Sequence, residues 1–297
     1  MEALEILSSL SMLSCSIFGA LCAITFIIIV IYHPQFRTTT ILLAFNSAIA
    51  GLIINVTSGS QALYQLNSDG NDALCAFRGF LLHAATGLLY QTLCVQTIYR
   101  LFVVVYATRR YLQSKRIIIS ITIIQWLISI TFAIPALTFD RIVYQPGSRI
   151  CQASLNDLVI FLYLSMFIFF CPLAIIVPIY IRIVQFTKQH SFVTIANQRR
   201  KQREIRLIRR LLIIVAMIFF MSFPYLIFFL RAQFFANAPT LPYAQRVSFV
   251  SISFGYSAWM LLNILFTDKV RKYLITKLQI SLTCARHIRI EPQTNTH

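Results

Sequence analysis

The sequence predicts an all-α membrane protein, a bundle of seven transmembrane helices. Of its 297 residues, 58% are hydrophobic and only 12% are charged, against about 25% charged residues in an ordinary soluble domain. Seven stretches of at least 20 residues contain no Asp, Glu, Lys or Arg: 6–36, 38–68, 79–99, 117–139, 158–181, 211–230 and 247–267. A helix that crosses a bilayer needs roughly 20 mostly apolar residues. Helices are expected because backbone groups inside a bilayer must bond to one another.

The predicted spans are centred on these uncharged stretches and run over about 7–32, 39–64, 75–107, 116–138, 155–186, 202–231 and 243–267. No internal repeat is visible, so residues 1–297 are expected to form a single domain. The acidic start and the long first stretch predict an uncleaved first span rather than a signal peptide. After the last span, residues 268–280 alternate basic with apolar residues, which is typical of a short amphipathic helix on a membrane surface.

Basic residues gather in the segments that follow the first, third, fifth and seventh spans. Counted between the uncharged stretches, from the end of each of these four to the start of the next or to the end of the chain, they hold 21 of the 26 Lys and Arg residues. The positive-inside rule then predicts an outer N-terminus and a cytoplasmic C-terminus, in a multi-pass protein of the plasma membrane. The net charge of +17 does not indicate a nucleic-acid partner, because the basic residues flank spans in short blocks. Anionic membrane lipids are the expected partners of these blocks.

Two of the seven cysteines stand at the predicted outer face. Cys75 begins the third span and Cys151 lies between the fourth and fifth. Disulfides persist on the outer, oxidising side of a membrane, so we expect these two to pair. Four cysteines lie inside spans, where a thiol is normally an apolar packing group. Cys284 follows the last span in a basic context and is either a palmitoylation site or a plain free thiol.

Prolines interrupt the fifth and sixth predicted spans. Pro172 and Pro178 lie in the fifth span, and Pro224 lies in the sixth. Each removes a backbone donor, so we expect kinks or loosened turns at these places.

Taken together, these features resemble the rhodopsin-like G-protein-coupled receptors, and the resemblance covers nearly the whole chain. Beyond the seven spans and the outer cysteine pair, pairs of residues in the third to sixth spans have the family's spacing: Cys75 with Arg100, Trp126 with Pro135, Pro172 with Tyr180, and Glu204 with Pro224. Five positions depart from the family's pattern: Tyr99, Gly51, Ser222, Ile264 and Thr267. Gly51 replaces an aspartate that helps the family bind sodium, so we expect no metal site.

The resemblance implies a receptor that binds an extracellular ligand and activates a heterotrimeric G protein. In such a receptor Arg100 would pair with Glu204 at rest, and Tyr180 would contact the freed arginine after the sixth helix swings outward. An arginine at a membrane boundary can also simply reach for headgroups, and Glu204 can relieve local charge on a solvated helix. The eroded motifs leave a second possibility open, a non-coupling decoy or scaffold with the same fold.

The ligand is predicted only as a peptide or small molecule. Leu82 occupies the position where aminergic receptors carry aspartate, and the seventh stretch has no lysine for a retinal Schiff base. Other candidate pocket residues are polar or aromatic side chains near the outer half of the spans: His83, Thr86, Tyr225, Arg231 and Tyr256. Packing is an alternative role for the aromatic ones, and membrane anchoring is one for Arg231. The sequence shows no catalytic motif, metal-ligand cluster or cofactor motif, so an enzyme is not expected.

Overall fold

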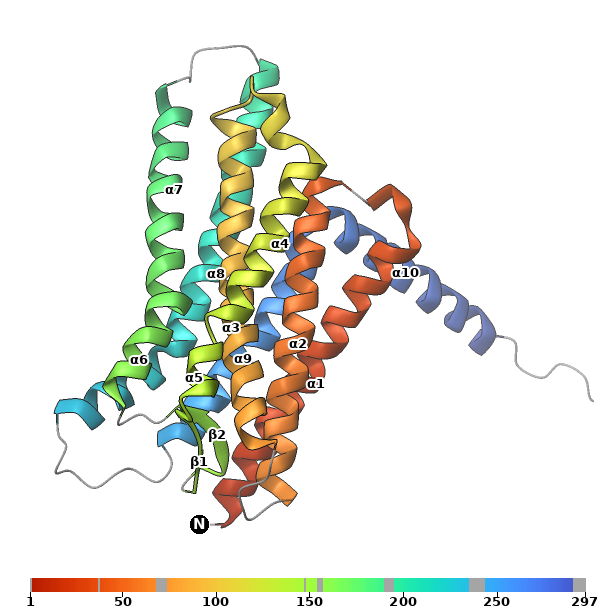
Figure 1. Cartoon of the computed structure of the whole chain (residues 1–297). Coiled ribbons are helices and arrows are strands. Elements are labelled where there is room, and N and C mark those ends of the chain that lie inside the picture. Colours follow the sequence, from red (N-terminus) through yellow and green to blue (C-terminus); the bar gives the residue numbers. More distant parts are fainter. Residues whose placement is uncertain are drawn as a thin grey trace, which may run out of the picture.

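The computed structural model describes residues 2–36, 38–67, 74–146, 148–153, 157–189, 195–234 and 244–290. Within these ranges, seven helical segments are long and apolar enough to cross a membrane. They lie side by side in one elongated bundle (Figure 1). The prediction of a seven-helix membrane fold is therefore confirmed.

The first four spans are built from five helices. They are α1 (Glu2–Tyr32), α2 (Thr39–Asn67), α3 (Cys75–Val104), α4 (Lys115–Thr131) and α5 (Ile134–Thr138), with 3₁₀ turns at Pro34–Phe36 and Arg110–Gln113. α1 begins earlier than the predicted span, and α3 ends at Val104 rather than at residue 107. Ser114 starts α4 by accepting a hydrogen bond at its hydroxyl from the Ile117 N–H at 3.4 Å, as expected of an N-cap residue.

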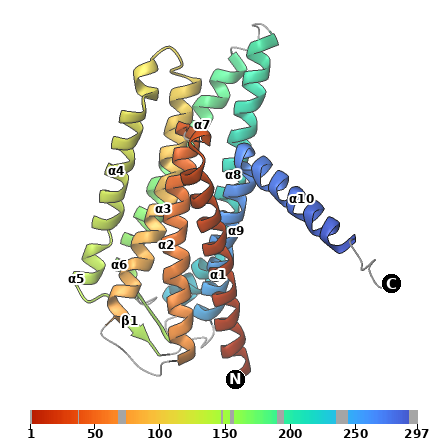
Figure 2. The same ribbon diagram turned by 90° about the vertical axis from the view of Figure 1, so that its right-hand side faces the viewer.

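The remaining spans overlap the predicted ones along most of their length. They are α6 (Leu158–Ser165), a π-helical turn (Met166–Phe170) and α7 (Cys171–Gln189), then α8 (Ile195–Phe234), α9 (Ala244–Phe266) and α10 (Asp268–Ile290). Asp157 caps α6 through the Ile160 N–H at 3.3 Å. α10 is longer than the surface helix predicted at 268–280, and it points away from the bundle (Figure 2).

Two prolines explain the irregular places in the fourth and fifth spans. Pro135 is the second residue of α5, just after the break that ends α4 at Thr131. Pro172 follows the π-helical turn, in which the Cys171 N–H donates to the Met166 carbonyl. The missing N–H of Pro172 is the one that the Ile168 carbonyl would accept in an unbroken α-helix, so a wider turn suits this position.

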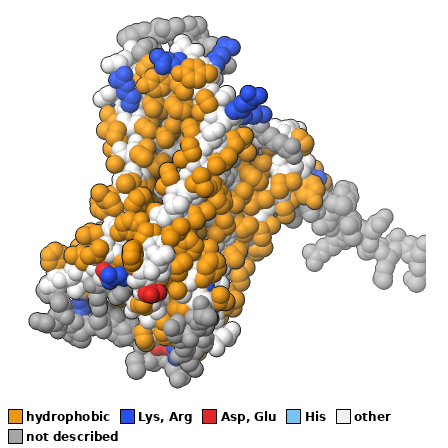
Figure 3. Space-filling model, viewed as in Figure 1, with side chains coloured by type: hydrophobic (Ala, Val, Ile, Leu, Met, Phe, Trp, Pro, Cys, Tyr) orange, Lys and Arg blue, Asp and Glu red, His pale blue; other side chains and the backbone are white. Residues whose placement is uncertain are grey.

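The buried core follows α3 and its neighbours. Leu82, Leu89 and Leu93 of α3 pack in one cluster with Trp259 and Met260 of α9. Most large apolar side chains on the outside of the bundle are exposed, as expected for a surface that lipid covers. Figure 3 shows these side chains over the flank, with several Lys and Arg side chains at the end where α7 and α8 are connected.

A two-stranded hairpin lies across the opposite end of the bundle (Figure 1). β1 (Ile142–Gln145) and β2 (Ile150–Ala153) pair antiparallel, with Ile142 opposite Ala153 and Gln145 opposite Ile150. These strands were not predicted from the sequence, which places the segment only between the fourth and fifth spans.

Candidate functional site

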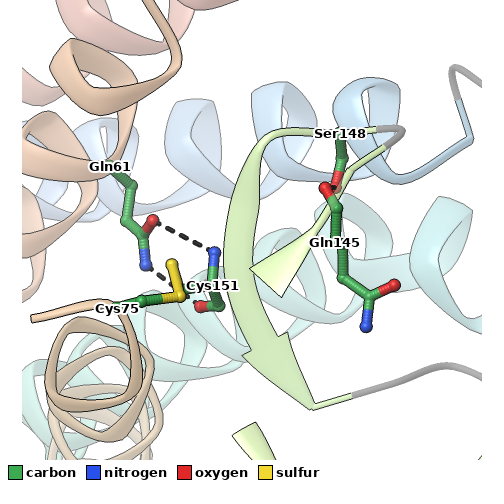
Figure 4. The surroundings of a disulfide bond; sticks show 5 residues. All are labelled: Gln61, Cys75, Gln145, Ser148 and Cys151. Carbon is green, nitrogen blue, oxygen red and sulfur yellow. Dashed lines mark hydrogen bonds between the residues drawn. A yellow bond between two sulfur atoms is a disulfide. The ribbon is translucent and has the colours of Figure 1, made fainter. Parts of the chain in front are cut away.

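The hairpin is fastened to the bundle by the predicted disulfide. Cys75, the first residue of α3, is bonded to Cys151 of β2, with Cα atoms 5.2 Å apart, so the pairing prediction is confirmed. Gln61 of α2 also holds Cys151. Its side-chain N–H donates to the Cys151 carbonyl at 3.1 Å, and its carbonyl oxygen accepts from the Cys151 N–H at 3.4 Å (Figure 4). The Gln61 amide thus satisfies both backbone groups of Cys151, as a neighbouring strand would.

A chain of hydrogen bonds links the hairpin turn to three helices. Ser9 of α1 donates to the Gln65 side chain at 3.0 Å, and Gln65 of α2 donates to the Ser148 carbonyl at 3.0 Å. The Ser148 hydroxyl then donates to the Gln245 side chain of α9 at 2.6 Å. Ser9, Gln65 and Ser148 are buried, so the turn is fixed across this end of the bundle.

Charged residues at the same end are engaged in contacts. Arg246 of α9, only 3% exposed, lies 3.7 Å from the Glu5 carboxylate of α1 and donates to the Glu5 carbonyl at 3.3 Å. Arg141 donates to Asp157 at 2.8 Å, and the Arg78 guanidinium lies 4.0 Å from the centre of the Tyr64 ring. These contacts tie α1 to α9 and brace the hairpin and its neighbouring helices.

Three of the predicted ligand residues come together inside the bundle. The Thr86 hydroxyl donates to the Leu82 carbonyl at 2.6 Å and lies 2.9 Å from the Tyr256 hydroxyl. Because the Thr86 proton is already committed, Tyr256 must be the donor in that second bond. Nearby in the sequence, the His83 Nε2 atom is buried and has no hydrogen-bond partner among the described residues.

The other two predicted ligand residues lie elsewhere on α8. The Tyr225 ring stacks on Phe161 of α6, with centroids 5.9 Å apart, and meets Phe249 of α9 edge-on at 6.2 Å. Phe161 also stacks on Phe229. Tyr225 therefore belongs to an aromatic row that packs α6, α8 and α9 together. Arg231 is half-buried, and it lies near the end of the same helix.

The opposite end of α3 carries the predicted switch residues. Arg100 is 8% exposed and Tyr180 of α7 is 6% exposed. The Tyr180 hydroxyl makes no hydrogen bond to a described residue, but Thr97 and Arg100 are polar groups beside it. Arg100 and Tyr180 are thus both buried, and Arg100 is near enough to act electrostatically on the Tyr180 hydroxyl. The side chains of Glu204 and Cys284 lie outside the part of the chain whose side chains are described.

Residues at the positions that depart from the receptor pattern make other contacts within the bundle. Tyr99 packs with Leu43 and Ile118 in an apolar cluster and supplies no charge beside Arg100. Next to Gly51, the space that a Cβ would enter holds the Met260 side chain. The Thr267 hydroxyl donates within its own helix to the Asn263 carbonyl at 2.8 Å.

Ser222 and Ile264 also pack within the bundle. The Ser222 hydroxyl lies 3.3 Å from that of Tyr90 on α3, and Ile264 is buried in a cluster with Phe26 and Val270. Among the described residues, no group of three or more His, Cys, Asp or Glu side chains could hold a metal ion.

One candidate functional residue, Arg210, was not predicted from the sequence. Arg210 of α8 donates to the Phe266 carbonyl at 2.7 Å and to the Asp268 carboxylate at 3.0 Å. A signal was available, because Arg210 is the last charge before the sixth uncharged stretch and Asp268 is the first after the seventh. Both charges therefore had to lie near the same membrane boundary.

The architecture is that of a seven-helix membrane receptor, with a disulfide-tethered hairpin at one end and a buried arginine at the other end of the third span. The family model described as "7 transmembrane receptor (rhodopsin family)" matches residues 23–263. The chain therefore belongs to the rhodopsin family of seven-transmembrane receptors, a family of receptors rather than of enzymes.

A structural comparison agrees with this assignment. The crystal structure of squid rhodopsin superposes with a TM-score of 0.82, covers 96% of this chain and 88% of the squid chain, and is 21% identical in sequence. At that identity the likeness concerns the fold. No curated protein matches the sequence significantly.

Proposed function

We propose that this chain is a plasma-membrane receptor that binds an extracellular ligand, a peptide or small molecule, and activates a heterotrimeric G protein through its cytoplasmic face. The observation that carries the proposal is the burial of Arg100, which is 8% exposed at the end of α3. An arginine that served only to anchor the chain would extend its guanidinium to the headgroups. Arg100 is instead buried in the bundle, near enough to Tyr180 of α7 to act on it electrostatically.

The proposed orientation places the N-terminus and the hairpin outside and α10 in the cytoplasm. The excess of Lys and Arg in the segments assigned to the inner side supports it, as does the disulfide between Cys75 and Cys151 at the proposed outer end. α10 would lie along the inner leaflet and bind anionic lipids through its basic residues. Lipidation of Cys284 would strengthen that attachment.

The proposed switch is a change of partner for Arg100. At rest Arg100 pairs with Glu204 and holds the inner ends of α3 and α8 together. In the active arrangement the inner part of α8 moves outward, and the Tyr180 hydroxyl bonds to the released arginine. The buried Tyr180 hydroxyl without a described hydrogen-bond partner supports this role, since such a group gains from any donor or acceptor that reaches it.

The proposed ligand site is the outer half of the bundle under the hairpin. Leu82, Thr86 and Tyr256, which are joined by hydrogen bonds, would form its floor, and the buried His83 Nε2 atom would bond to the ligand. Tyr225 and Arg231 on α8 would line its far side. A ligand that contacts both groups would bias the position of α8, which is the requirement for an agonist.

The test compares the full chain with an Arg100→Ala variant in cultured cells, at matched surface expression, using biosensors for each G-protein class without added ligand. Arg182 on α7 is exposed, so Arg182→Ala serves as a control for the loss of one positive charge. Basal signal that Arg100→Ala abolishes and Arg182→Ala keeps supports the proposal.

If the unmodified chain gives no basal G-protein signal, the next variant to measure is Glu204→Ala, which removes the proposed resting partner of Arg100. Signal from this variant supports a latched receptor. If this variant also gives no signal, coupling is refuted and the alternative, a seven-helix decoy or scaffold, is favoured. The observation that favours this alternative is that Tyr99 packs in an apolar cluster and Thr267 bonds only within its own helix among the described contacts.

A further inference from the structure

We propose that Arg210 is a resting-state latch that fastens α8 to the junction of α9 and α10, and that its release permits the outward movement of α8. This inference deepens the proposed function and rests on it. The latch is a second device, separate from the pairing of Arg100 with Glu204. Three contacts made by one guanidinium define it.

The geometry uses both ends of the Arg210 guanidinium. One nitrogen donates to the Phe266 carbonyl at 2.7 Å and the other to the Asp268 carboxylate at 3.0 Å. The guanidinium carbon also lies 5.5 Å from the centre of the Phe266 ring. A flat cation with two donors can satisfy an oxygen on each side of a helix junction at once, which a lysine ammonium cannot do with the same geometry.

The junction itself attracts a cation. Phe266 is the last residue of α9, and the final carbonyls of a helix lack partners within it and carry partial negative charge. Asp268 is the first residue of α10, where a carboxylate is favoured by the helix dipole. Arg210 therefore meets two negative groups that two successive helices place side by side.

Burial indicates that these bonds have a substantial effect. The Arg210 side chain is 14% exposed and that of Asp268 is 48% exposed, so the arginine end of the pair is shielded while the carboxylate stays partly hydrated. Charge-assisted hydrogen bonds in such places are about twice as strong as neutral ones. Asp268 also contacts Arg271 at 3.3 Å, so the carboxylate keeps a partner when Arg210 leaves. This makes the contact reversible.

The latch fits the departure at position 99. Tyr99 packs in an apolar cluster, so the residue before Arg100 carries no charge, unlike the acidic residue of the family's pattern. A second contact that keeps α8 closed would complement the pairing proposed for Arg100. Arg210 joins α8 to α9 at the end of the bundle where closure is required.

The experiment measures the position of α8 directly, in the full chain reconstituted in lipid nanodiscs. Spin labels on noncanonical amino acids at Leu212 and Tyr111, both exposed, report the distance from α8 to the segment before α4 without touching native cysteines. Arg210→Ala is expected to raise the ratio of long to short distances about tenfold, the effect of losing two charge-assisted hydrogen bonds from a shielded arginine. Arg209→Ala, which removes an exposed charge next to it, is the matched control and should leave the ratio unchanged.

Further variants separate the latch from a general loss of structure. Asp268→Asn keeps the shape of the side chain and removes only its charge, so it should open α8 partially even if Arg210→Ala folds poorly. Arg210→Lys should fall between the parent and Arg210→Ala. Because the two residues act on one contact, Arg210→Ala combined with Asp268→Ala should open α8 no further than Arg210→Ala alone.

The outcomes distinguish the latch from the proposed function. A distance distribution in Arg210→Ala and Asp268→Asn identical to that of the parent overturns the latch, and it does so whether or not the chain signals. Open α8 in those variants supports the latch even when no G protein is activated, in which case the proposed coupling is what fails. Additive effects of the two alanine changes overturn the pairing of Arg210 with Asp268.

Discussion

Replacing Gln61 with leucine should destabilise the receptor, because the side chain that bonds to the backbone of β2 is lost. Gln61 is fully buried, and its amide makes both hydrogen bonds to the backbone of Cys151. Leucine has nearly the same size but can neither donate nor accept. Each buried backbone group left unsatisfied costs ~1–3 kcal/mol, and the more apolar leucine offsets part of that, so the net loss should be about 2–4 kcal/mol.

Thermal unfolding in detergent can measure this change through the protein's own thiols. Cys94 is a buried free thiol, and a fluorogenic maleimide reacts with such a group only after the bundle opens. The disulfide stays intact throughout, because the assay contains no reductant. A lower unfolding temperature is expected for Gln61→Leu. In a separate assay with added thiol, the Cys75–Cys151 bond of this variant should be reduced faster, because the hairpin is held less firmly.

The matched control is Gln185→Leu, the same exchange at an exposed position of α7. Its effect should lie within about 0.5 kcal/mol of zero. The reasoning is refuted if Gln61→Leu is as stable as Gln185→Leu, since the backbone of Cys151 would then not depend on a side-chain partner.

Three other outcomes are expected. Gly79→Ala should lower stability by ~1–3 kcal/mol, since its added methyl would overlap the hairpin backbone, whereas Gly59→Ala, whose methyl would meet only a side chain at 3.4 Å, should be neutral or stabilising in the same unfolding assay. Glu5→Gln should lower the unfolding temperature by weakening the contact with buried Arg246, a loss of ~1–2 kcal/mol for a half-exposed partner, and should do so less at high salt. Tyr99→Asp should reduce ligand-free G-protein activation about twofold to fivefold, the effect of an added ion pair worth ~0.5–1 kcal/mol; equal signalling at equal surface expression would contradict it.

The number of spans and the outer disulfide could be predicted because they depend on local composition. The stretch 38–68 has no charge for 31 residues, a length that is typical of a membrane span. Cys75 and Cys151 were the two cysteines placed at the outer face, so their pairing needed no distance information. The bend at Pro135 and the wide turn before Pro172 also follow from a single missing N–H.

Contacts between distant spans could not be predicted, because charge-free stretches do not fix how each helix is rotated. Thr86 and Tyr256 are 170 residues apart and meet, while Tyr225, which seemed equally suited to a pocket, turns into an aromatic row. The hairpin was missed because four-residue strands give too short an alternating pattern, and because Gln61, which completes their pairing, lies within a transmembrane helix.

The uninterrupted length of α8 makes it a lever with unequal arms. Ile195–Phe234 is one helix, and Pro224 is the proline inside it. At ~1.5 Å per residue, about 15 Å of helix lies on one side of Pro224 and about 44 Å on the other. If both sides of Pro224 tilt together about this point, a displacement of about 1 Å at Phe234 becomes about 3 Å at Ile195 and about 1.4 Å at Arg210. Lengthening the 3.0 Å contact with Asp268 by that amount takes it beyond hydrogen-bonding distance, so in the proposed switch a movement of about 1 Å at Phe234 would release Arg210.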